Sequence, residues 1–301
     1  MIQFITRKKL DVDKYNACIE NSMQSNIYGF SWYLDLACDN WSVFVLNDYE
    51  AVMPVPWRKK FFIKYVYPPL WIIQLGIYSK VIEDENEFLI ELFSQFKYVQ
   101  MRTNTQNAFS MFQPYQIEKR LQVLQMKSTF ENIIKGFRKD RRRALTKSQK
   151  SALKENWKGN PEDLITLHKQ NVGKRAKDFN EHEYDKLLRV IKLSIVKGRG
   201  EVLSIYDSQN KLVASGFFLL YNKSVVKLVS ATDFNNRKNG ANTFLIERAI
   251  FKYHNDFDVF DFGGSSMKTI ADFNLSFGSS HKVYSELQYN NLPKLLKLFK
   301  K

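Results

Sequence analysis

The loop Arg237–Asn242 is the part of the sequence whose residue types point most directly to a ligand. It reads R-x-x-G-x-N and lies between a strand-like segment, SVVKLVSATD, and an amphipathic helical segment, NTFLIERAIFKYH. The unpaired amides and the dipole at the start of a helix attract phosphate, and a glycine there lets a pyrophosphate approach closely. A plain loop with a permissive glycine is the alternative. The predicted phosphate-binding residues are Arg237, Lys238, Asn239, Gly240, Ala241 and Asn242.

A second feature is the segment Lys135–Lys158, which carries ten basic and two acidic residues and so supplies eight of the fifteen net positive charges of the 301-residue chain. Such concentrated charge predicts an anionic partner, either a nucleotide, a tRNA or a polyphosphate headgroup, with a solvated basic face as the alternative. Arg141 falls on the apolar stripe of this segment, where a buried guanidinium needs a carboxylate or phosphate partner. The basic stripe, at helical spacing, consists of Lys139, Arg143, Lys147, Lys150, Lys154 and Lys158.

Other chemistry is poorly represented. The four histidines share no ligand spacing, and the sequence has no H-E-x-x-H motif, no G-x-S-x-G elbow and no Walker loop. Only Cys18 and Cys38 occur, which excludes a disulfide scaffold and a four-thiolate zinc site. We therefore expect no metal site, and we expect His168 and His182 on solvated helix faces. Motifs of sequence-specific DNA readers are absent, which leaves nonspecific phosphate contact as the nucleic-acid option.

Two halves of the chain repeat one order of elements. Between residues 41 and 102 the hydrophobic pattern predicts three strands, a helix and a strand, and the same order recurs between residues 201 and 262. The basic segment, predicted to be helical from Phe130, joins the halves. The predicted fold class is mixed α/β, with tandem domains of residues 1–127 and 128–301. Two unrelated mixed domains are the alternative to a duplication.

The segments that bear on localisation are the two ends and one apolar stretch. The opening MIQFITRKKLDVD has no apolar core after its charges, unlike a signal peptide. The stretch Phe61–Tyr78 is interrupted by Lys64 and by the Pro68-Pro69 pair, which favours buried strands over a membrane-spanning helix. The closing LPKLLKLFKK predicts a short basic amphipathic helix that either docks on the protein or contacts a membrane peripherally. We expect a cytoplasmic protein.

The order of strand, basic glycine loop, helix and strand resembles the GNAT acyltransferase superfamily, whose acyl-CoA loop usually reads Gln/Arg-x-x-Gly-x-Gly/Ala. More specifically, the sequence resembles the Fem-like branch, in which two GNAT-type domains are fused. The signature of that branch is matched by Asp261-Phe262-Gly263-Gly264-Ser265 and then by Phe273-Asn274-Leu275-Ser276-Phe277-Gly278. The linking segment from Gly136 resembles the same branch. Two positions depart from the pattern: Asn242 stands in place of Gly or Ala, and Asn274 in place of the lysine of F-K-x-x-F-G.

The resemblance implies direct transfer of an acyl group from acyl-CoA, such as acetyl-CoA, to an amine or hydroxyl, without a covalent enzyme intermediate. In that scheme the backbone of Val229, Ser230 and Ala231 binds the donor and polarises the carbonyl oxygen. Asp261 is the candidate base or amine-binding carboxylate, and capping of the Gly263-Gly264 turn is its alternative role. Tyr284 is the candidate acid for the leaving group, and packing in the core is its alternative.

The acceptor is expected to lie between the two halves. Aromatic and basic groups there suit an amphiphilic or carboxylate-bearing acceptor, although Trp and Tyr on strands are more often core. The candidate substrate-binding residues are Trp57, Arg58, Tyr67, Gln74, Arg141, Ser265 and Asn274.

Two other functions stay open. The first is transfer of an amino acid from aminoacyl-tRNA to a cell-wall precursor or peptide, which the basic segment favours and Asn274 disfavours. The second is a catalytically degenerate protein that binds an anionic polymer, such as nucleic acid, without turnover; Asn242 and Asn274 together favour it. Acceptor identity, acyl chain and oligomeric state are not specified by any motif.

Overall fold

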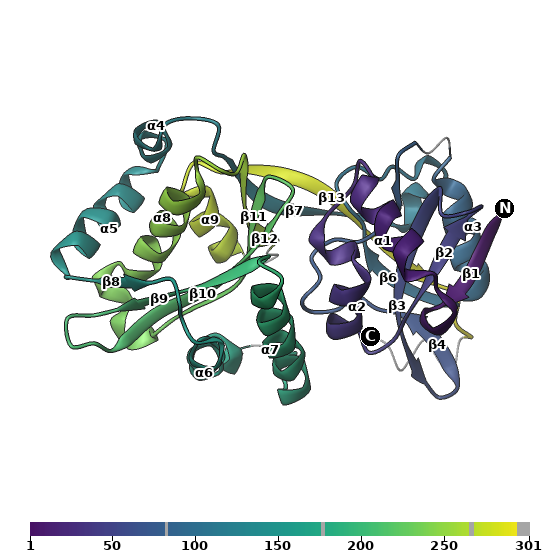
Figure 1. Cartoon of the computed structure of the whole chain (residues 1–301), viewed down its shortest axis with the longest axis horizontal. Helices are drawn as coiled ribbons and strands as arrows, with labels where there is room; N and C mark the ends of the chain where they lie inside the picture. The colour runs from purple at the N-terminus through teal and green to yellow at the C-terminus, as the bar shows by residue number, and fades with distance from the viewer. Residues whose placement is uncertain (82–83, 176–177, 265–267, 294–301) are drawn as a thin grey trace. The chain divides into compact units, whose positions relative to one another are not determined.

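The computed structural model of the chain describes residues 1–81, 84–175, 178–264 and 268–293, without the side chains of residues 175 and 236–238. Two compact units are present: unit 1 contains Met1–Lys119 and Val283–Lys301, and unit 2 contains Arg120–Lys282 (Figure 1). Each boundary falls within a long strand, β7 (Gln116–Gln125) or β13 (Ser280–Asn290), so the chain passes between the units twice. The predicted domains 1–127 and 128–301 divide the sequence once and stay a prediction.

Unit 1 is built on a mixed sheet in the order β1-β2-β3-β4-β6-β13, with β5 paired to β3. The pairing of β4 with β6 is parallel, and the other pairs in this sheet are antiparallel. Side chains such as Phe44, Met53 and Leu89 are fully buried and form its core. The strands are β1 (Ile2–Thr6), β2 (Trp41–Leu46), β3 (Ala51–Lys60), β4 (Ile63–Val66), β5 (Tyr78–Ser79) and β6 (Tyr98–Arg102). The α-helices described in this unit are α1 (Val12–Asn21), α2 (Ser31–Ala37) and α3 (Asn86–Gln95).

Within unit 2 the strands follow the order β7-β12-β11-β10-β9-β8. The pairing of β11 with β12 is parallel, and the other pairs between these strands are antiparallel. Helices α5 and α8 lie over one face and α6 and α7 over the other (Figure 1). The strands after β7 are β8 (Lys154–Asn156), β9 (Gly200–Tyr206), β10 (Leu212–Tyr221), β11 (Ser224–Thr232) and β12 (Val259–Gly264). The α-helices described are α4 (Phe130–Lys135), α5 (Lys139–Lys150), α6 (Pro161–Gln170), α7 (Glu181–Val196), α8 (Ala241–Tyr253) and α9 (Lys268–Leu275).

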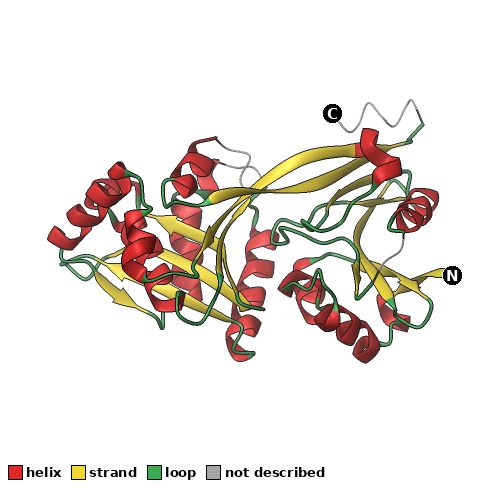
Figure 2. Cartoon of the chain, turned by 90° about the horizontal axis from the view of Figure 1, so that it is seen from above, coloured by secondary structure: helices red, strands yellow, loops and turns green. Residues whose placement is uncertain are grey.

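Helix α8 connects the parallel strands β11 and β12 and fills the core of unit 2. Its apolar side chains recur every three or four residues, as expected for one buried helix face. Leu245, Ile246 and Ala249 are fully buried in one cluster with Phe218 and Phe260 of the sheet. Two neighbouring parallel strands need a crossover connection, and α8 provides it between the end of β11 and the start of β12. Figure 2 distinguishes the helices from the strands by colour.

The mixed α/β class is confirmed. The order β9, β10, β11, α8 and β12 in the second half matches β2, β3, β4, α3 and β6 in the first, except that the two-residue strand β5 lies between β4 and α3. The prediction of a single basic helix between the two halves is wrong. The segment forms two helices, α4 and α5, separated at Gly136, and α5 ends at Lys150, so Lys154 lies on β8 instead. Among the described residues, no helix combines the length and hydrophobicity needed to cross a membrane.

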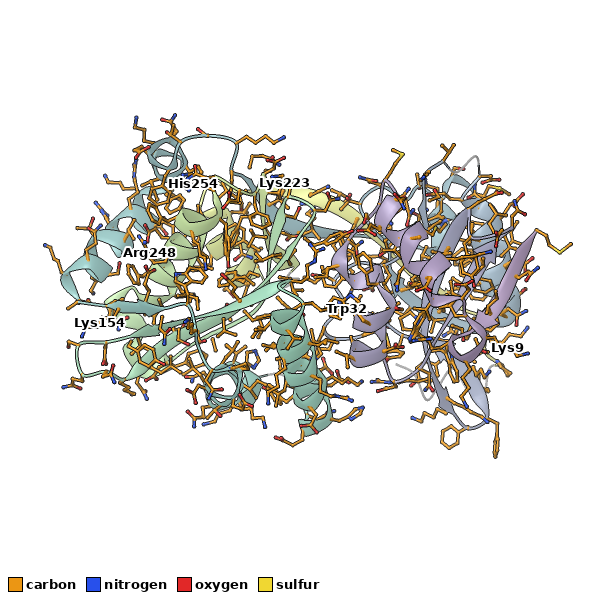
Figure 3. All side chains as sticks on the ribbon, in the orientation of Figure 1. Lys9, Trp32, Lys154, Lys223, Arg248 and His254 are labelled. Carbon is orange, nitrogen blue, oxygen red and sulfur yellow. The ribbon has the colours of Figure 1, made fainter. Side chains whose placement is uncertain are left out.

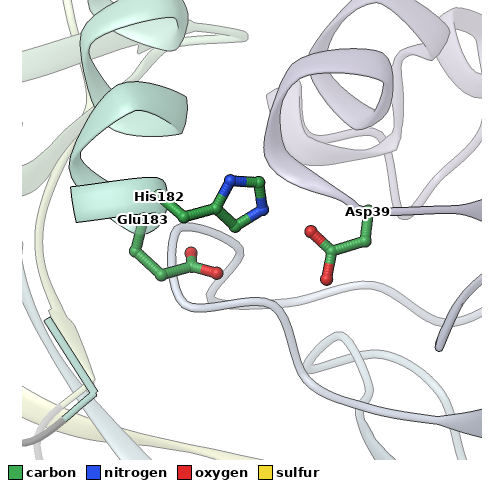
Figure 4. Close-up of side chains that lie close together, drawn as sticks. All are labelled: Asp39, His182 and Glu183. Carbon is green, nitrogen blue, oxygen red and sulfur yellow. The ribbon is translucent and has the colours of Figure 1, made fainter. Parts of the chain in front are cut away.

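The expectation that His168 is solvated is also wrong. The side chain lies on α6 with 3% exposure, and its Nδ1 is 2.9 Å from the hydroxyl of Tyr184 on α7. Helix periodicity alone did not reveal this, because it does not show that the helix carrying His182, α7, packs against α6. His182, in contrast, is exposed at the start of α7, next to the buried Glu183 (Figure 4).

We predict that His168 makes the protein acid-sensitive. Burial lowers the pKa of His168 to about 4 from 6.5, so the unfolded chain binds a proton more readily than the folded one between these values. Stability is therefore lost as pH falls below 6.5, by about 2 kcal/mol at pH 5. Melting temperatures between pH 7 and 5 should fall less steeply for His168→Gln than for the parent. An unchanged slope, or an equal effect of the exposed His182→Gln, would contradict this.

Candidate active site

Strands β11 and β12 part in the middle of unit 2. They pair only at Ser224↔Val259, Val225↔Phe260 and Val226↔Asp261, whereas β11 continues to pair with β10 as far as Thr232. The β10 register skips Leu228, which marks a bulge on β11 just beyond the last β12 pair. Successive strand residues direct their N–H and C=O groups to opposite sides. Residues 227–232 therefore present backbone groups to the side that β12 has left, with no strand partner there in the described structure.

The predicted donor-binding residues Val229, Ser230 and Ala231 lie in this stretch of β11. Val229 and Ala231 are buried, and Ser230 is half-buried. A backbone N–H of such a strand can bind a carbonyl oxygen without a charged side chain. Their role as donor contacts stays a prediction.

The predicted phosphate loop leads from β11 into α8, as expected. Gly240 has a φ of +82° and a Cβ there would lie 2.6 Å from the carbonyl oxygen of Ala144 on α5, so only glycine fits. The Oδ1 of Asn239 accepts a hydrogen bond from the N–H of Ala241 at 2.9 Å, which satisfies one amide of the first turn of α8. Asn242 is the second residue of that turn. The side chains of Arg237 and Lys238 lie outside the described residues.

Arg141 on α5 lies against the first turn of α8. Its guanidinium donates to the Thr243 hydroxyl at 2.8 Å and stacks on the Phe273 ring, 4.8 Å from the ring centroid. Its Nη2 is 3.5 Å from the carboxylate of Asp140, but its Nε is buried and has no hydrogen-bond partner among the residues that the structure describes. A buried unpaired N–H is costly, and a cation beside a helix N-terminus is unfavourable unless an anion lies between them. The geometry therefore fits a phosphate-bearing ligand beside Arg141 and α8.

A chain of polar side chains lies beside the parting of the strands. The Nζ of Lys227 on β11 donates to Oδ1 of Asn274 on α9 at 3.4 Å. The Asn274 amide in turn donates to Oε1 of Gln122 on β7 at 3.1 Å, and the Gln122 amide lies 3.5 Å from Nδ1 of His281. Gln122 and Asn274 are almost completely buried. Buried polar side chains are costly unless they are hydrogen-bonded to one another, as these are. This network is therefore the most specific feature of the site.

Asp261 and Lys227 have shifted pKa values in this environment. Desolvation raises the pKa of Asp261 to about 6, although the Gly263 N–H, which donates to its Oδ1 at 2.8 Å, and the charges of Lys282 and Lys227 act in the opposite direction. Desolvation likewise lowers the pKa of Lys227 to about 8, against the charge of Asp261. Asp261 thus does cap the Gly263 turn, and it is also a carboxylate whose pKa suits proton transfer near neutral pH.

Sequence reasoning missed Lys227 and Gln122. Lys227 is the one charged residue within the apolar strand run SVVKLVSAT, and that position alone could have drawn notice. No local signal marks Gln122, because its partner Asn274 is 152 residues away along the chain. Asn274 was predicted to bind substrate; in the structure it connects Lys227 to Gln122, and its direct contact with substrate stays a prediction. Ser265 lies outside the described residues.

The candidate acceptor residues of unit 1 have internal partners. The guanidinium of Arg58 pairs with the carboxylate of Asp39 and stacks 3.9 Å from the centroid of the Tyr67 ring. The Tyr67 hydroxyl accepts a hydrogen bond from the backbone N–H of Asp39, which precedes β2 (Figure 4), and Trp57 donates to Ser42. These contacts give Trp57, Arg58 and Tyr67 a structural role within unit 1.

Tyr67 also lines a small hollow with Pro68, Pro69 and Arg102. Gln74 is half-buried nearby in sequence but does not line it. Tyr284, the candidate acid, is buried on the part of β13 that belongs to unit 1. Asp261 belongs to unit 2, so an acid–base pair of the two stays a prediction, as does acceptor binding by the unit 1 residues.

The basic face is retained on α5. Lys139, Arg143, Lys147 and Lys150 are exposed, and none of them forms an ion pair with a described residue. Arg138, in contrast, pairs with Asp140 at 2.6 Å. Lys154 continues the basic surface from the edge strand β8 (Figure 3). The charge thus remains available to an anionic partner after the helix has folded.

Comparison with known proteins identifies the fold. Neither a family model nor a curated protein matches the sequence. FemX matches over 99% of this chain and 100% of its own, with a TM-score of 0.68 and 10% identity. L-PGS from Bacillus licheniformis matches over 96% and 94%, with a TM-score of 0.57 and 10% identity. A tandem GNAT protein from the clavulanic acid biosynthesis pathway matches over 98% and 100%, with a TM-score of 0.55 and 8% identity.

The chain therefore has the fold of the GNAT acyltransferases. Because FemX and a tandem GNAT protein match it along their whole lengths, the arrangement is the tandem, Fem-like one that the sequence motifs predict. At identities of about one residue in ten the likeness extends to the fold, and the chemistry has to be argued from the site.

Proposed function

We propose that the protein is an acyltransferase that moves an acyl group from acyl-CoA to an amine or hydroxyl. The observation that carries the proposal is the parting of β11 and β12 at Val226 and Asp261, with Lys227 and Asp261 beside the exposed strand edge. The start of α8 and the unpaired Nε of Arg141 support a phosphate-bearing donor at the end of β11.

The reaction needs three contributions from this site. A backbone N–H of β11 polarises the carbonyl oxygen of the donor, and the Lys227 ammonium stabilises the negative charge that develops there. The acceptor nitrogen attacks the carbonyl carbon and gives its proton to the Asp261 carboxylate. The carbon–sulfur bond then breaks, and the leaving thiolate takes the proton that Asp261 holds, which restores the carboxylate. No covalent bond to the protein forms at any step.

Thermal unfolding with acyl-CoA tests the donor. A ligand at about 100 times its dissociation constant should stabilise the protein by roughly 2.7 kcal/mol. We expect acetyl-CoA or a longer acyl-CoA to raise the melting temperature, and we expect Arg141→Ala to abolish the shift. Free CoA should also raise it, because the phosphates supply most of the contact. No shift with any of these ligands would count against CoA as the donor.

Aminoacyl-tRNA is the second candidate donor, and the unpaired basic face of α5 favours it. We predict that the triple variant Lys139→Glu, Arg143→Glu, Lys147→Glu binds tRNA at least tenfold more weakly than the parent in a gel shift at low salt. Affinity of the parent should fall steeply with salt, because phosphate contacts release counterions. The matched control reverses three exposed lysines of unit 1, Lys8, Lys9 and Lys97. Equal losses of tRNA affinity in both triple variants would mean that binding depends on the net positive charge of the protein and not on the α5 face.

A further inference from the structure

The turn between β3 and β4 exposes two phenylalanines. Lys60 pairs with Ile63, so Phe61 and Phe62 form a two-residue hairpin loop. Phe61 is 66% and Phe62 92% exposed. Phenylalanine side chains are usually buried, and two adjacent rings at the tip of a hairpin form an exposed apolar surface.

The backbone of the turn shows that these residues are not favoured by the hairpin itself. Phe61 and Phe62 have φ values of +46° and +66°. Two-residue hairpin loops with positive φ at both positions strongly prefer Asn-Gly, and bulky side chains there are strained. The stability of the turn thus disfavours phenylalanine at both positions, which indicates that the two rings serve a purpose other than forming the turn.

Lysines surround the two rings. The ammonium of Lys59 lies 5.5 Å from the centroid of the Phe62 ring, and that of Lys60 lies 5.5 Å from the centroid of the Phe61 ring. Lys59 is also directly opposite Lys64 in the strand register. Like charges at opposed positions are destabilising unless an anion lies nearby. The hairpin tip is thus apolar at its end and cationic directly behind it.

The strand register places another segment at the same edge of the sheet. β6 runs parallel to β4, with Val66 opposite Val99, and β13 runs antiparallel to β6, with Asn290 opposite Tyr98. The end of β13 therefore lies at the edge from which the Phe61 hairpin extends. The short basic helix that the sequence predicts for LPKLLKLFKK falls mainly on residues 294–301, which lie outside the described structure.

We propose that the β3–β4 hairpin tip binds the surface of a bilayer that contains anionic lipid. Phe61 and Phe62 enter the boundary between headgroups and acyl chains, and Lys59, Lys60 and Lys64 contact the headgroup phosphates. Charge decides between this partner and a second copy of the chain, because self-association would bring two sets of lysines together. The lysine stems pack beside the rings while their ammonium groups stay in water, as at membrane interfaces.

Vesicle flotation of the full chain tests the proposal without any acyl donor. We expect binding to vesicles of phosphatidylcholine with phosphatidylglycerol, and much weaker binding to phosphatidylcholine alone. The double variant Phe61→Asn, Phe62→Gly should bind at least about tenfold more weakly, since each ring contributes roughly that factor when buried. It installs the favoured turn residues, so it should also melt at a higher temperature, and loss of binding cannot then be blamed on unfolding.

A matched pair of charge variants separates the hairpin from general attraction. Lys59→Glu, Lys60→Glu should weaken binding at least about 25-fold, from about fivefold per lysine. Lys8→Glu, Lys9→Glu changes the net charge equally at an exposed site elsewhere in unit 1 and should weaken binding far less; Lys9 is marked in Figure 3. Equal losses in the two variants would overturn the proposal, as would unchanged binding of the Asn-Gly variant.

Depth measurements add a direct readout. In the variant Phe62→Trp, lipids with brominated acyl chains should quench the fluorescence of the new tryptophan more strongly than that of the tryptophans already present in the parent protein. Absence of parent binding to anionic vesicles, or hairpin-dependent dimers in sedimentation, would also overturn the proposal. Because none of these measurements involves acyl transfer, their failure would leave the proposed enzymatic function untouched.

Discussion

Replacing Asp261 with asparagine is expected to lower kcat/KM for acyl transfer by about 10²- to 10⁴-fold, the range that a general base contributes. Asparagine keeps the Oδ1 acceptor for the Gly263 N–H, so the turn that Asp261 caps should persist. Only the ability to take a proton is lost. The measurement is the rate of thiol release from acyl-CoA with an amine acceptor found by screening.

The same substitution is expected to stabilise the protein. The folded pKa of Asp261 is raised to about 6 from 3.8, so the folded state prefers the protonated carboxyl and loses stability as pH rises through this interval. Above pH 6 the full cost is about 3 kcal/mol, which Asp261→Asn removes, and at pH 5 the gain shrinks to about half. Melting temperatures at both pH values measure it.

A matched control makes this result interpretable. Asp258→Asn changes an exposed carboxylate just before β12 that pairs with Lys127 at 3.0 Å. It should change neither turnover nor the pH dependence of stability. If Asp261→Asn retained full turnover, Asp261 would be a turn cap alone and the proposed base would be wrong.

Replacing Lys227 with methionine is the second change with a large expected effect. Methionine fits the half-buried position over the Phe262 ring but carries no charge, so transition-state charge on the carbonyl oxygen loses its cation. Removal of one such donor costs about 10²- to 10³-fold in kcat. The expected signature lies in the pH profile. The parent should show a rise near pH 6 from Asp261 and a fall near pH 8 from Lys227.

In Lys227→Met the fall near pH 8 should disappear, and the rise should move above pH 6 because the nearby cation no longer lowers the pKa of Asp261. The control is Lys223→Met in the β10–β11 turn, where the lysine is exposed and donates to the carbonyl of Asp256 (Figure 3). If activity still fell near pH 8 in Lys227→Met, a group other than Lys227 would be responsible for that part of the pH profile.

The fold was largely predictable because its signals are local. Alternation of apolar residues marked β2, β3, β9 and β10, and the spacing of Leu245, Ile246 and Ala249 marked α8. The position of Gly240 between strand and helix followed from the same patterns. The tight approach of Ala144 to Gly240 did not, because it depends on how α5 packs across 96 residues of sequence.

The site was less predictable because its decisive contacts join distant segments. The apolar stripe marked Arg141 as a candidate for an anion contact, but the Thr243 hydroxyl and the Phe273 ring beside it could not be inferred from spacing. The departure at Asn274 looked like the loss of a cation. The structure instead has the Lys227 ammonium beside that asparagine, a contact that depends on the register of β11 against α9.

Affinity labelling with bromoacetyl-CoA would test the central claim most directly, because it requires no knowledge of the acceptor. If the acyl group of the donor lies between β11 and β12, the neutral Lys227 amine should displace bromide and form a carbon–nitrogen bond, since its pKa near 8 leaves part of it unprotonated at pH 7.5. Peptide mass spectrometry should find the adduct on Lys227, and excess acetyl-CoA should prevent it. Labelling confined to Cys18 or Cys38, or unaffected by acetyl-CoA, would contradict the proposed site.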